Sequence, residues 1–274
     1  MTIDPVLHTL SFETEGQGPP VILLHGLAAS RYDWQSLAPV LVKAGYQTYT
    51  VDLFGHGDSP KPDDPGCYHT NLLYETSLAW MNSLAVSEPP ILVGHSLGGY
   101  LSLYLAMQHS HKIRGLILIN PFYTPKQLSP LVRLLQRRPE WGSKALRVIP
   151  LEIIDAALGW DPTPINRFSA EARRQIAIDY KRASPHILRF PATIANLTEW
   201  LPQVTLPTLV IWGDKDLTLK PAFFESLVTS LPKGVGTPIH GAGHQPHIGQ
   251  PDLVNQLVIG FLAEIDVDER HHPS

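Results

Sequence analysis

The 274-residue sequence predicts an α/β protein with a mostly parallel β-sheet, helices on both faces of that sheet, and an inserted helical cap. Short, continuous apolar runs such as 21–24 and 91–93 are typical of strands that are buried on both faces. These runs alternate with longer segments whose apolar residues have helical spacing. The alternation stops at residue 122 and resumes only at residue 207, which indicates an insertion between two strands.

The first 121 residues contain the first part of this alternation. Gly and Pro residues separate the predicted elements, as expected for turns. The predicted elements are, in chain order, a weak edge strand at 7–13, a strand at 21–24, a helix within 30–45, a strand at 48–51, a helix at 71–84, a strand at 91–93, a helix at 100–107 and a strand at 113–119.

The segment 122–205 has helical patterns interrupted by prolines, and Lys and Arg outnumber Asp and Glu in it. We interpret it as a helical cap, or lid, inserted into a core domain made of residues 1–121 and 206–274. Helical patterns occupy 128–138 and 170–183 of the cap. The core is predicted to resume with a strand at 208–212, a helix at 219–231, a strand at 235–240, a helix at 251–264 and a polar tail at 266–274.

Composition excludes several classes of protein. The net charge of −4 gives no reason to expect a nucleic-acid partner. The single cysteine, Cys67, cannot form an internal disulfide, which fits a reducing compartment. The N-terminus lacks the pattern of a signal peptide, and no apolar run reaches the roughly 20 residues of a membrane span. We therefore expect a cytoplasmic protein without stable membrane insertion. Its oligomeric state stays open.

A serine flanked by glycines follows the strand at 91–93. Gly94, Ser96 and Gly98 have the spacing of a sharp turn between a strand and a helix, in which bulkier neighbours would collide. Such a turn exposes the serine oxygen and directs the backbone amide of Leu97 toward it. The alternative, a glycine-rich turn with an idle serine, explains the strand and helix on either side less well.

Three other chemically relevant positions follow strands of the predicted sheet. Gly26 lets the chain bend after the strand at 21–24, so that the amide of Leu27 can point into a cleft. Asp216 follows the strand at 208–212, and His244 follows the last strand. Because the carboxyl ends of parallel strands meet at one edge of a sheet, we expect these residues to lie close to Ser96.

Two groups of side chains have the composition of a metal site. Asp52, His56 and Asp58 lie within one turn, where capping of the turn is the simpler explanation. The second group, made of His240, His244 and His247, lacks an acidic fourth ligand and a metalloprotease spacing. We expect neither a metal nor a cofactor.

With these motifs, the chain resembles enzymes of the α/β-hydrolase fold. His25-Gly26 resembles the family's oxyanion loop, residues 94–99 its nucleophile elbow, residues 213–216 its acid turn and Gly243-His244 its base. The resemblance implies a triad of Ser96, His244 and Asp216, with Leu27 and Leu97 as oxyanion-hole amides. In the family the acid lies three residues after the glycine, which favours Asp216 over Asp214.

The resemblance leaves the substrate open. Ser96 disfavours the haloalkane dehalogenases and epoxide hydrolases, which use an aspartate nucleophile. A small-molecule carboxylic ester is the preferred substrate, with carbon–carbon, thioester or lactone cleavage as alternatives. The predicted substrate pocket contains Trp34, Phe122, Tyr123, Trp141, Trp160 and Leu217.

Two further hypotheses do not require catalysis. In the first, the chain is a ligand-binding, receptor-like protein on a hydrolase scaffold, and its triad turns over slowly or not at all. A basic cap that docks on an anionic surface is a further hypothesis, which predicts salt-sensitive binding to acidic vesicles.

Overall fold

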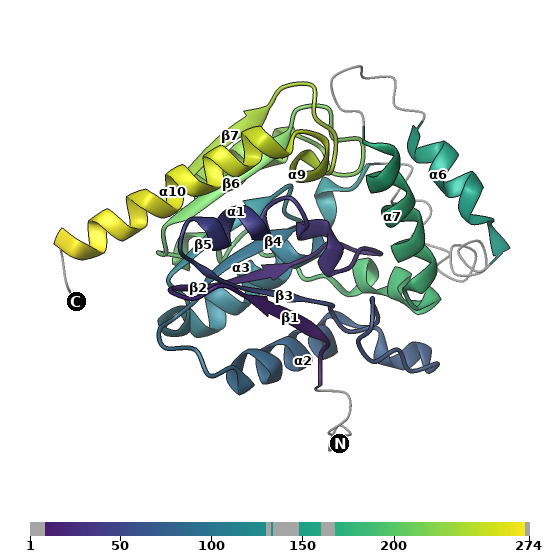
Figure 1. The fold of residues 1–274 in the computed structure, drawn as a ribbon, viewed down its shortest axis with the longest axis horizontal. Helices are drawn as coiled ribbons and strands as arrows, with labels where there is room; N and C mark the ends of the chain where they lie inside the picture. The colour runs from purple at the N-terminus through teal and green to yellow at the C-terminus, as the bar shows by residue number, and fades with distance from the viewer. Residues whose placement is uncertain (1–8, 130–132, 134–147, 160–167, 272–274) are drawn as a thin grey trace.

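A computed structural model describes residues 9–129, 133, 148–159 and 168–271 of the chain (Figure 1). Seven strands form one sheet in the order β1-β3-β2-β4-β5-β6-β7. Strand β1 pairs antiparallel with β3, and every other pairing is parallel. The strands are β1 (Phe12–Glu15), β2 (Pro20–Leu24), β3 (Gln47–Val51), β4 (Ile91–His95), β5 (Gly115–Ile119), β6 (Thr208–Gly213) and β7 (Gly234–Ile239).

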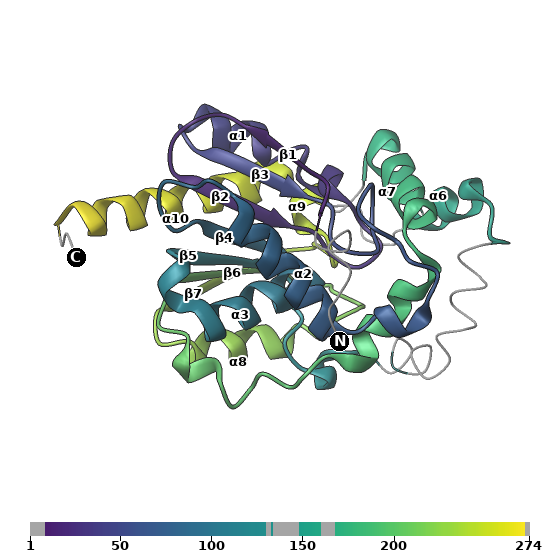
Figure 2. The same cartoon turned by 90° about the horizontal axis from the view of Figure 1, so that it is seen from below.

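Helices cover both faces of the sheet. Figure 2 shows α1 and α10 on one face and α2, α3 and α8 on the other. The α-helices are α1 (Ala38–Lys43), α2 (Thr70–Ser83), α3 (Leu97–His109), α6 (Leu151–Gly159), α7 (Ala170–Arg182), α8 (Ala222–Ser230), α9 (Pro246–Gly249) and α10 (Pro251–His271). Short 3-10 helices are η2 (Arg31–Trp34), η3 (Pro65–Cys67), η4 (Ser110–Lys112), η5 (Pro125–Gln127), η6 (Pro185–Thr193) and η7 (Leu201–Gln203).

The alternation of side chains along each strand divides the core into two clusters. In β2, Ile22 and Leu24 pack into the cluster under α2, α3 and α8, whereas Val21 and Leu23 pack into the cluster under α1 and α10. Both faces of the central strands are therefore buried, which explains why β2, β4 and β5 have nearly continuous apolar sequences.

The register aligns the carboxyl ends of the central strands. His95 at the end of β4 is paired with Ile119 at the end of β5, and Ile119 is paired with Ile211 near the end of β6. Gly213 at the end of β6 is paired with Ile239 at the end of β7. The loops that follow these strands consequently begin at the same edge of the sheet.

The described residues between β5 and β6 contain helices and no strand of the sheet. Helices α6 and α7 lie together beyond one end of the sheet in both views (Figures 1 and 2). The Ser184 amide donates to the Gly55 carbonyl at 2.8 Å, and Arg182 forms an ion pair with Asp58. Because Gly55 and Asp58 follow β3, these contacts place the end of α7 over the carboxyl edge of the sheet.

Most of the predicted cap helix at 128–138 lies outside the described residues. Two other predicted elements differ markedly from the structure. The edge strand is Phe12–Glu15 rather than 7–13, and the predicted polar tail at 266–274 is helical as far as His271. The Tyr46 hydroxyl donates to Asp266 at 2.6 Å, and Arg114 forms an ion pair with the same carboxylate. These tertiary contacts hold the polar end of α10 against the core. In the described part of the chain, no helix combines the length and the apolarity that crossing a bilayer requires.

Candidate active site

Ser96 lies at the turn between β4 and α3 with a strained backbone. Its φ of 49° and ψ of −108° fall outside the regions that a non-glycine residue commonly adopts. Its amide donates to the Ile119 carbonyl at 3.0 Å, and its carbonyl accepts from the amides of Tyr100 at 3.1 Å and Phe122 at 3.0 Å. These bonds to α3 and to the end of β5 hold the strained conformation in place.

The flanking glycines make this turn sterically possible. A Cβ atom on Gly98 would lie 2.0 Å from the carbonyl oxygen of Leu24, which ends the neighbouring strand β2. A Cβ on Gly94 would lie 2.5 Å from the Gly98 carbonyl oxygen and 2.5 Å from the Ser102 hydroxyl. The structure therefore requires glycine at both positions of the sequence motif.

Three side chains form one chain of hydrogen bonds. His244 Nε2 lies 3.0 Å from Ser96 Oγ, and His244 Nδ1 lies 2.7 Å from Asp216 Oδ2. A carboxylate only accepts, so Nδ1 carries the imidazole hydrogen, and Nε2 of the neutral ring accepts from the serine hydroxyl. The structure thus brings together Ser96, His244 and Asp216, with the imidazole in the tautomer that a general base needs.

Asp216 is buried and surrounded by donors. Its Oδ1 accepts from the amides of Thr218 at 2.7 Å and Leu219 at 2.9 Å, while its Oδ2 accepts from Asn120 Nδ2 at 2.7 Å. Burial favours the neutral acid, but His244 and the hydrogen-bond donors outweigh it and lower the pKa of the Asp216 carboxyl. The carboxylate is therefore charged where it faces His244.

Asn120 was missed as a site residue by the sequence analysis. It directly follows β5, has a positive φ of 41°, and accepts from the Gly213 amide at 3.3 Å through Oδ1. Its side chain consequently links the acid turn to the end of the central strand. The available signal was its position, since it is a polar residue at the carboxyl end of a buried strand, like Ser96 and Asp216.

Leu27 and Leu97 lie where an oxyanion hole would be built. Leu97 is the first residue of α3, and Leu27 follows Gly26 in the loop after β2. Among the described residues, neither backbone amide has a hydrogen-bond acceptor. A Cβ on Gly26 would lie 3.4 Å from Ser96 Cβ, so this loop packs directly against the elbow. Leu97 is thus adjacent to Ser96 in the chain, the loop that carries Leu27 packs against Ser96, and both amides are available to an oxyanion.

Two buried histidines hold the loop that is predicted to supply the oxyanion hole. The Ala28 amide, at a residue with a φ of 61°, donates to His56 Nε2 at 3.1 Å, and the Leu53 amide donates to His25 Nε2 at 3.0 Å. Burial, followed by the neighbouring His25, lowers the pKa of His56 to about 3. Both rings accept hydrogen bonds through Nε2 and act as structural supports. In this turn Asp52 and Asp58 form ion pairs with Arg31 instead of converging on His56.

The other acid and base candidates have different partners. Asp214 accepts from the Gly241 amide at 2.8 Å and lies 3.0 Å from His240 Nδ1, so it ties two loops together. The His240 side chain is 84% exposed. His247 is buried at the start of α9, where its Nε2 lies 3.8 Å from Asp33 Oδ2. Among these residues, only Asp216 and His244 join the hydrogen-bond chain from Ser96.

His95, next to the nucleophile, contacts the backbone of His244 and the carboxylate of Asp33. Its Nε2 lies 2.9 Å from the His244 carbonyl oxygen, and its Nδ1 lies 3.6 Å from Asp33 Oδ2. Burial outweighs the opposing influence of Asp33 and lowers the pKa of His95 to about 4. His95 therefore joins the elbow to the backbone of the loop that carries His244.

The six residues predicted to line the substrate pocket lie in different environments. Trp34 is 0% exposed, and its ring packs 5.1 Å from the His247 ring in the core, so its assignment to a substrate pocket is corrected. Phe122 and Tyr123 are buried in the core cluster under α3. Leu217 is 82% exposed beside Asp216. Trp141 and Trp160 lie outside the described residues.

The chain is similar to known proteins in sequence and in fold. The chain is 25% identical over 268 residues to AB hydrolase superfamily protein YfhM of Bacillus subtilis. This match covers 89% of this chain and 90% of that protein. It is 24% identical over 306 residues to bifunctional epoxide hydrolase 2 of Rattus norvegicus; this match covers 96% of the chain but only 54% of that protein. A thermophilic esterase structure from Thermogutta terrifontis aligns with a TM-score of 0.79 and 27% identity over 93% of both chains.

A model of the alpha/beta hydrolase fold family matches residues 19–249. The matched segment begins just before β2, ends at the last residue of α9, and includes the whole Ser96, Asp216 and His244 arrangement. By its sequence, its sheet topology and the position of these side chains, the chain belongs to the alpha/beta hydrolase fold family.

Proposed function

We propose that this protein hydrolyses a small carboxylic ester through an acyl-enzyme on Ser96. The observation that carries the proposal is the continuous hydrogen-bond chain from Ser96 Oγ through His244 to Asp216. A serine hydroxyl is a weak nucleophile at neutral pH and needs an adjacent base that is itself oriented by a third group. The strained turn at Ser96 presents the hydroxyl to that base.

In the first half of the reaction, His244 Nε2 takes the Ser96 proton while Oγ bonds to the ester carbonyl carbon. The resulting oxyanion accepts from the amides of Leu27 and Leu97. One donor of this kind typically lowers the barrier by about 3 to 4 kcal/mol. The imidazolium then gives its proton to the leaving alkoxide, the carbon–oxygen bond breaks, and the alcohol departs.

In the second half, a water molecule replaces the alcohol. His244 takes a proton from this water, the hydroxide adds to the acyl carbon, and the bond to Ser96 Oγ breaks as His244 returns the proton to the serine. The charged Asp216 stabilises the imidazolium in both halves. The products are a carboxylic acid and an alcohol, and the residues named supply every proton transfer.

Ester cleavage is favoured over other reactions of this fold for two reasons. It needs nothing beyond the triad and the two amides, whereas carbon–carbon cleavage needs further polar groups placed by the cap. The structure from Thermogutta terrifontis, at 27% identity, is described as an esterase. We assign residues 1–121 and 206–274 to the hydrolase core and 122–205 to a cap. The end of its described helix α7 lies over the carboxyl edge of the sheet, where a cap would limit access to Ser96.

The test is turnover of p-nitrophenyl esters of increasing acyl chain length by the full chain, together with labelling by a fluorophosphonate probe. Ser96→Ala should abolish both turnover and labelling, because it removes the nucleophile. Ser87→Ala changes an exposed serine and should alter neither. Tight ester binding without turnover by the wild type would instead support a ligand-binding protein and overturn the enzymatic proposal.

A further inference from the structure

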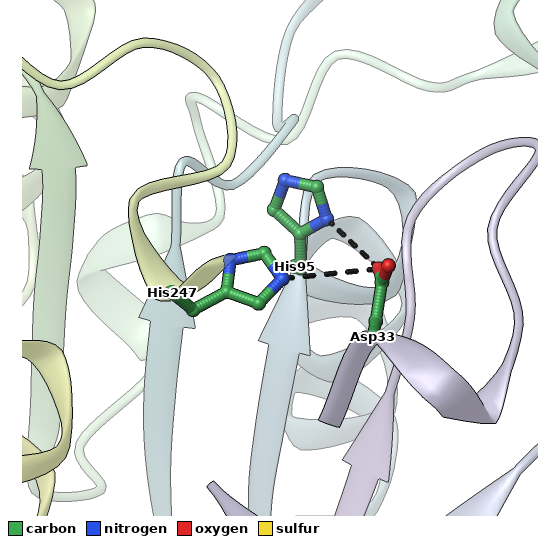
Figure 3. Close-up of side chains that lie close together, drawn as sticks. All are labelled: Asp33, His95 and His247. Atoms are coloured by element: carbon green, nitrogen blue, oxygen red, sulfur yellow. Dashed lines mark ion pairs between the residues drawn. The ribbon is translucent and has the colours of Figure 1, made fainter. Parts of the chain in front are cut away.

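Three buried side chains converge behind the nucleophile. Figure 3 shows the rings of His95 and His247 directed at the carboxylate of Asp33. His95 Nδ1 lies 3.6 Å and His247 Nε2 lies 3.8 Å from the same oxygen, Asp33 Oδ2. The three residues are 5%, 2% and 2% exposed for Asp33, His95 and His247. They come from η2, the end of β4 and α9, so three distant parts of the chain meet at this point.

Among the described residues, the three atoms that face one another, Asp33 Oδ2, His95 Nδ1 and His247 Nε2, have no hydrogen-bond partner. The other ring nitrogen of His247, Nδ1, is also buried without one in this part of the chain. A buried polar atom left unpaired typically costs about 1 to 3 kcal/mol, so four such atoms in one place call for a common explanation. A ligand that satisfies several of them at once would provide it.

The hydrogen bond of His95 identifies the charge of that ligand. His95 Nε2 lies 2.9 Å from the His244 carbonyl oxygen, which only accepts, so Nε2 carries the hydrogen. In the neutral ring, Nδ1 is then a lone pair that faces the Asp33 carboxylate oxygen. Two acceptors that face each other in a buried site repel, unless a cation lies between them.

The spacing fits a metal ion better than a shared proton. A charged N–H to carboxylate bond is about 2.7 to 2.9 Å long, well below the observed 3.6 and 3.8 Å. Ligand atoms about 2.1 Å from a tetrahedral zinc ion lie about 3.4 Å apart, a few tenths of an ångström from the observed separations. The three ligand atoms all lie within 4.8 Å of one another.

Gly26 leaves His95 Nδ1 approachable. A Cβ atom at this position would lie only 2.7 Å from Nδ1, so any side chain would cover the nitrogen. Two imidazole nitrogens and one carboxylate oxygen suit first-row divalent ions such as Zn²⁺, whereas Mg²⁺ and Ca²⁺ prefer oxygen ligands. We propose that Asp33, His95 and His247 form a buried binding site for a divalent transition-metal ion, zinc being the first candidate.

This site differs from the group of histidines considered from the sequence, because it uses neither His240 nor His244. It also has no role in the ester chemistry above. A bound ion would cross-link η2, β4 and α9, and through His95 it would hold the backbone of His244. A bound ion would therefore act on the fold rather than on the substrate.

The experiment measures metal binding by the full chain. Protein stripped with a chelator is incubated with Zn²⁺ or Co²⁺ and passed through a desalting column, and its metal content and its Co²⁺ visible absorption are recorded. We expect about one ion per chain. Asp33→Asn and His247→Gln each keep the side-chain volume while removing a ligand, and should weaken binding at least about tenfold. His240→Gln removes an exposed imidazole from the same loop region and should bind like the wild type.

A second measurement on the wild type avoids dependence on the folding of these variants. Nitrogen-15 NMR of the imidazoles should show His95 Nδ1 and His247 Nε2 shifting on addition of Zn²⁺ but not of Mg²⁺. Unchanged His95 and His247 signals, or metal content equal in wild type, Asp33→Asn and His247→Gln, would overturn the proposal. The cluster would then be a buried imidazolium–carboxylate group.

Discussion

Asn120 donates a hydrogen bond of 2.7 Å to the same Asp216 oxygen that lies 2.7 Å from His244 Nδ1. The side-chain amide thus fixes the direction from which Asp216 meets the imidazole. Asn120 also has a φ of 41°, a conformation that Asn and Gly tolerate better than other residues. Its position at the end of β5 combines a backbone requirement with a specific side-chain contact.

Asn120→Gly should lower kcat by about 10 to 100 fold with little change in KM. The substitution keeps the positive φ accessible but removes a hydrogen bond to a charged group, which is worth about 1.5 to 3 kcal/mol. Asn120→Asp has nearly the same shape and should be worse at neutral pH, because it places a second carboxylate against Asp216. Steady-state kinetics on a p-nitrophenyl ester measure both. Equal activity of the wild type and Asn120→Gly would show that Asn120 does not position Asp216.

Gly98 and Gly260 provide a matched test of the nucleophile elbow. Gly98→Ala places a Cβ 2.0 Å from the Leu24 carbonyl oxygen, so it should displace β2 from α3 and lower both Tm and activity. Gly260 lies within α10, where a Cβ meets no atom within 4 Å. Gly260→Ala should stabilise the protein by about 0.5 to 1 kcal/mol through its helix propensity. Thermal unfolding distinguishes them, and similar Tm values for both variants would contradict the steric role of Gly98.

Asp179 on α7 is expected to make stability depend on pH. It is buried, accepts from Gln175 Nε2 at 3.0 Å and faces Ser30 on the core. Burial is the main cause that raises its pKa to about 7, from 3.8 in an ordinary environment. The folded state therefore holds this proton more tightly than the unfolded chain does. The stability that this tighter binding contributes is fully present below about pH 4 and is lost as the pH rises toward 7 and beyond.

Asp179→Asn should therefore raise Tm at pH 8 by a few degrees and change it little at pH 4, since each kcal/mol moves Tm by about 2 to 4 °C. The amide keeps the shape of the acid and carries no charge at either pH. Glu199→Gln, at an exposed position, should show neither effect. A Tm gain of Asp179→Asn that is the same at both pH values would contradict a titration of this carboxyl.

The sequence predicted those parts of the structure that depend on residues close together in the chain. The apolar runs of β2, β4 and β5 and the glycines around Ser96 act on their immediate neighbours, so the sheet and the elbow were predictable. The Asn120 contact joins residues 96 positions apart, and the bond from Tyr46 to Asp266 spans 220 positions. No pattern within one segment carries such information, which explains why Asn120 was missed and why the helical end of α10 was predicted as a tail.

The location of Trp34 shows the same limit in packing. Trp34 lies at the end of η2, and with Leu37 and with Leu41 of α1 it packs into one core cluster. Which group covers the indole ring depends on the tertiary fold, and the structure places His247 against it. A large aromatic near a glycine-rich loop is equally compatible with a pocket wall and with a core position, so sequence spacing alone could not separate them.

Asp52 and Asp58 both form ion pairs with Arg31, but their different burial predicts different contributions to the free energy of unfolding. The Asp52 side chain is 1% exposed, 2.5 Å from Arg31 Nη1, and also accepts from the Arg31 amide at 2.8 Å. The Asp58 side chain is 50% exposed and lies between Arg31 and Arg182 of α7. Breaking a buried pair leaves an uncompensated charge and typically costs about 3 to 5 kcal/mol, whereas an exposed pair contributes about 0 to 1 kcal/mol.

Asp52→Asn should therefore destabilise the chain by at least about 2 kcal/mol, a value below the full buried-pair cost because Arg31 retains some access to water. Asp58→Asn should change the free energy of unfolding by less than about 1 kcal/mol. It should instead weaken the contact between α7 and the loop after β3, and salt should reduce the difference from wild type. Urea unfolding at low and high ionic strength measures both effects. A loss for Asp58→Asn as large as for Asp52→Asn would show that the bridge to α7, rather than burial of Asp52, dominates the stability of this loop.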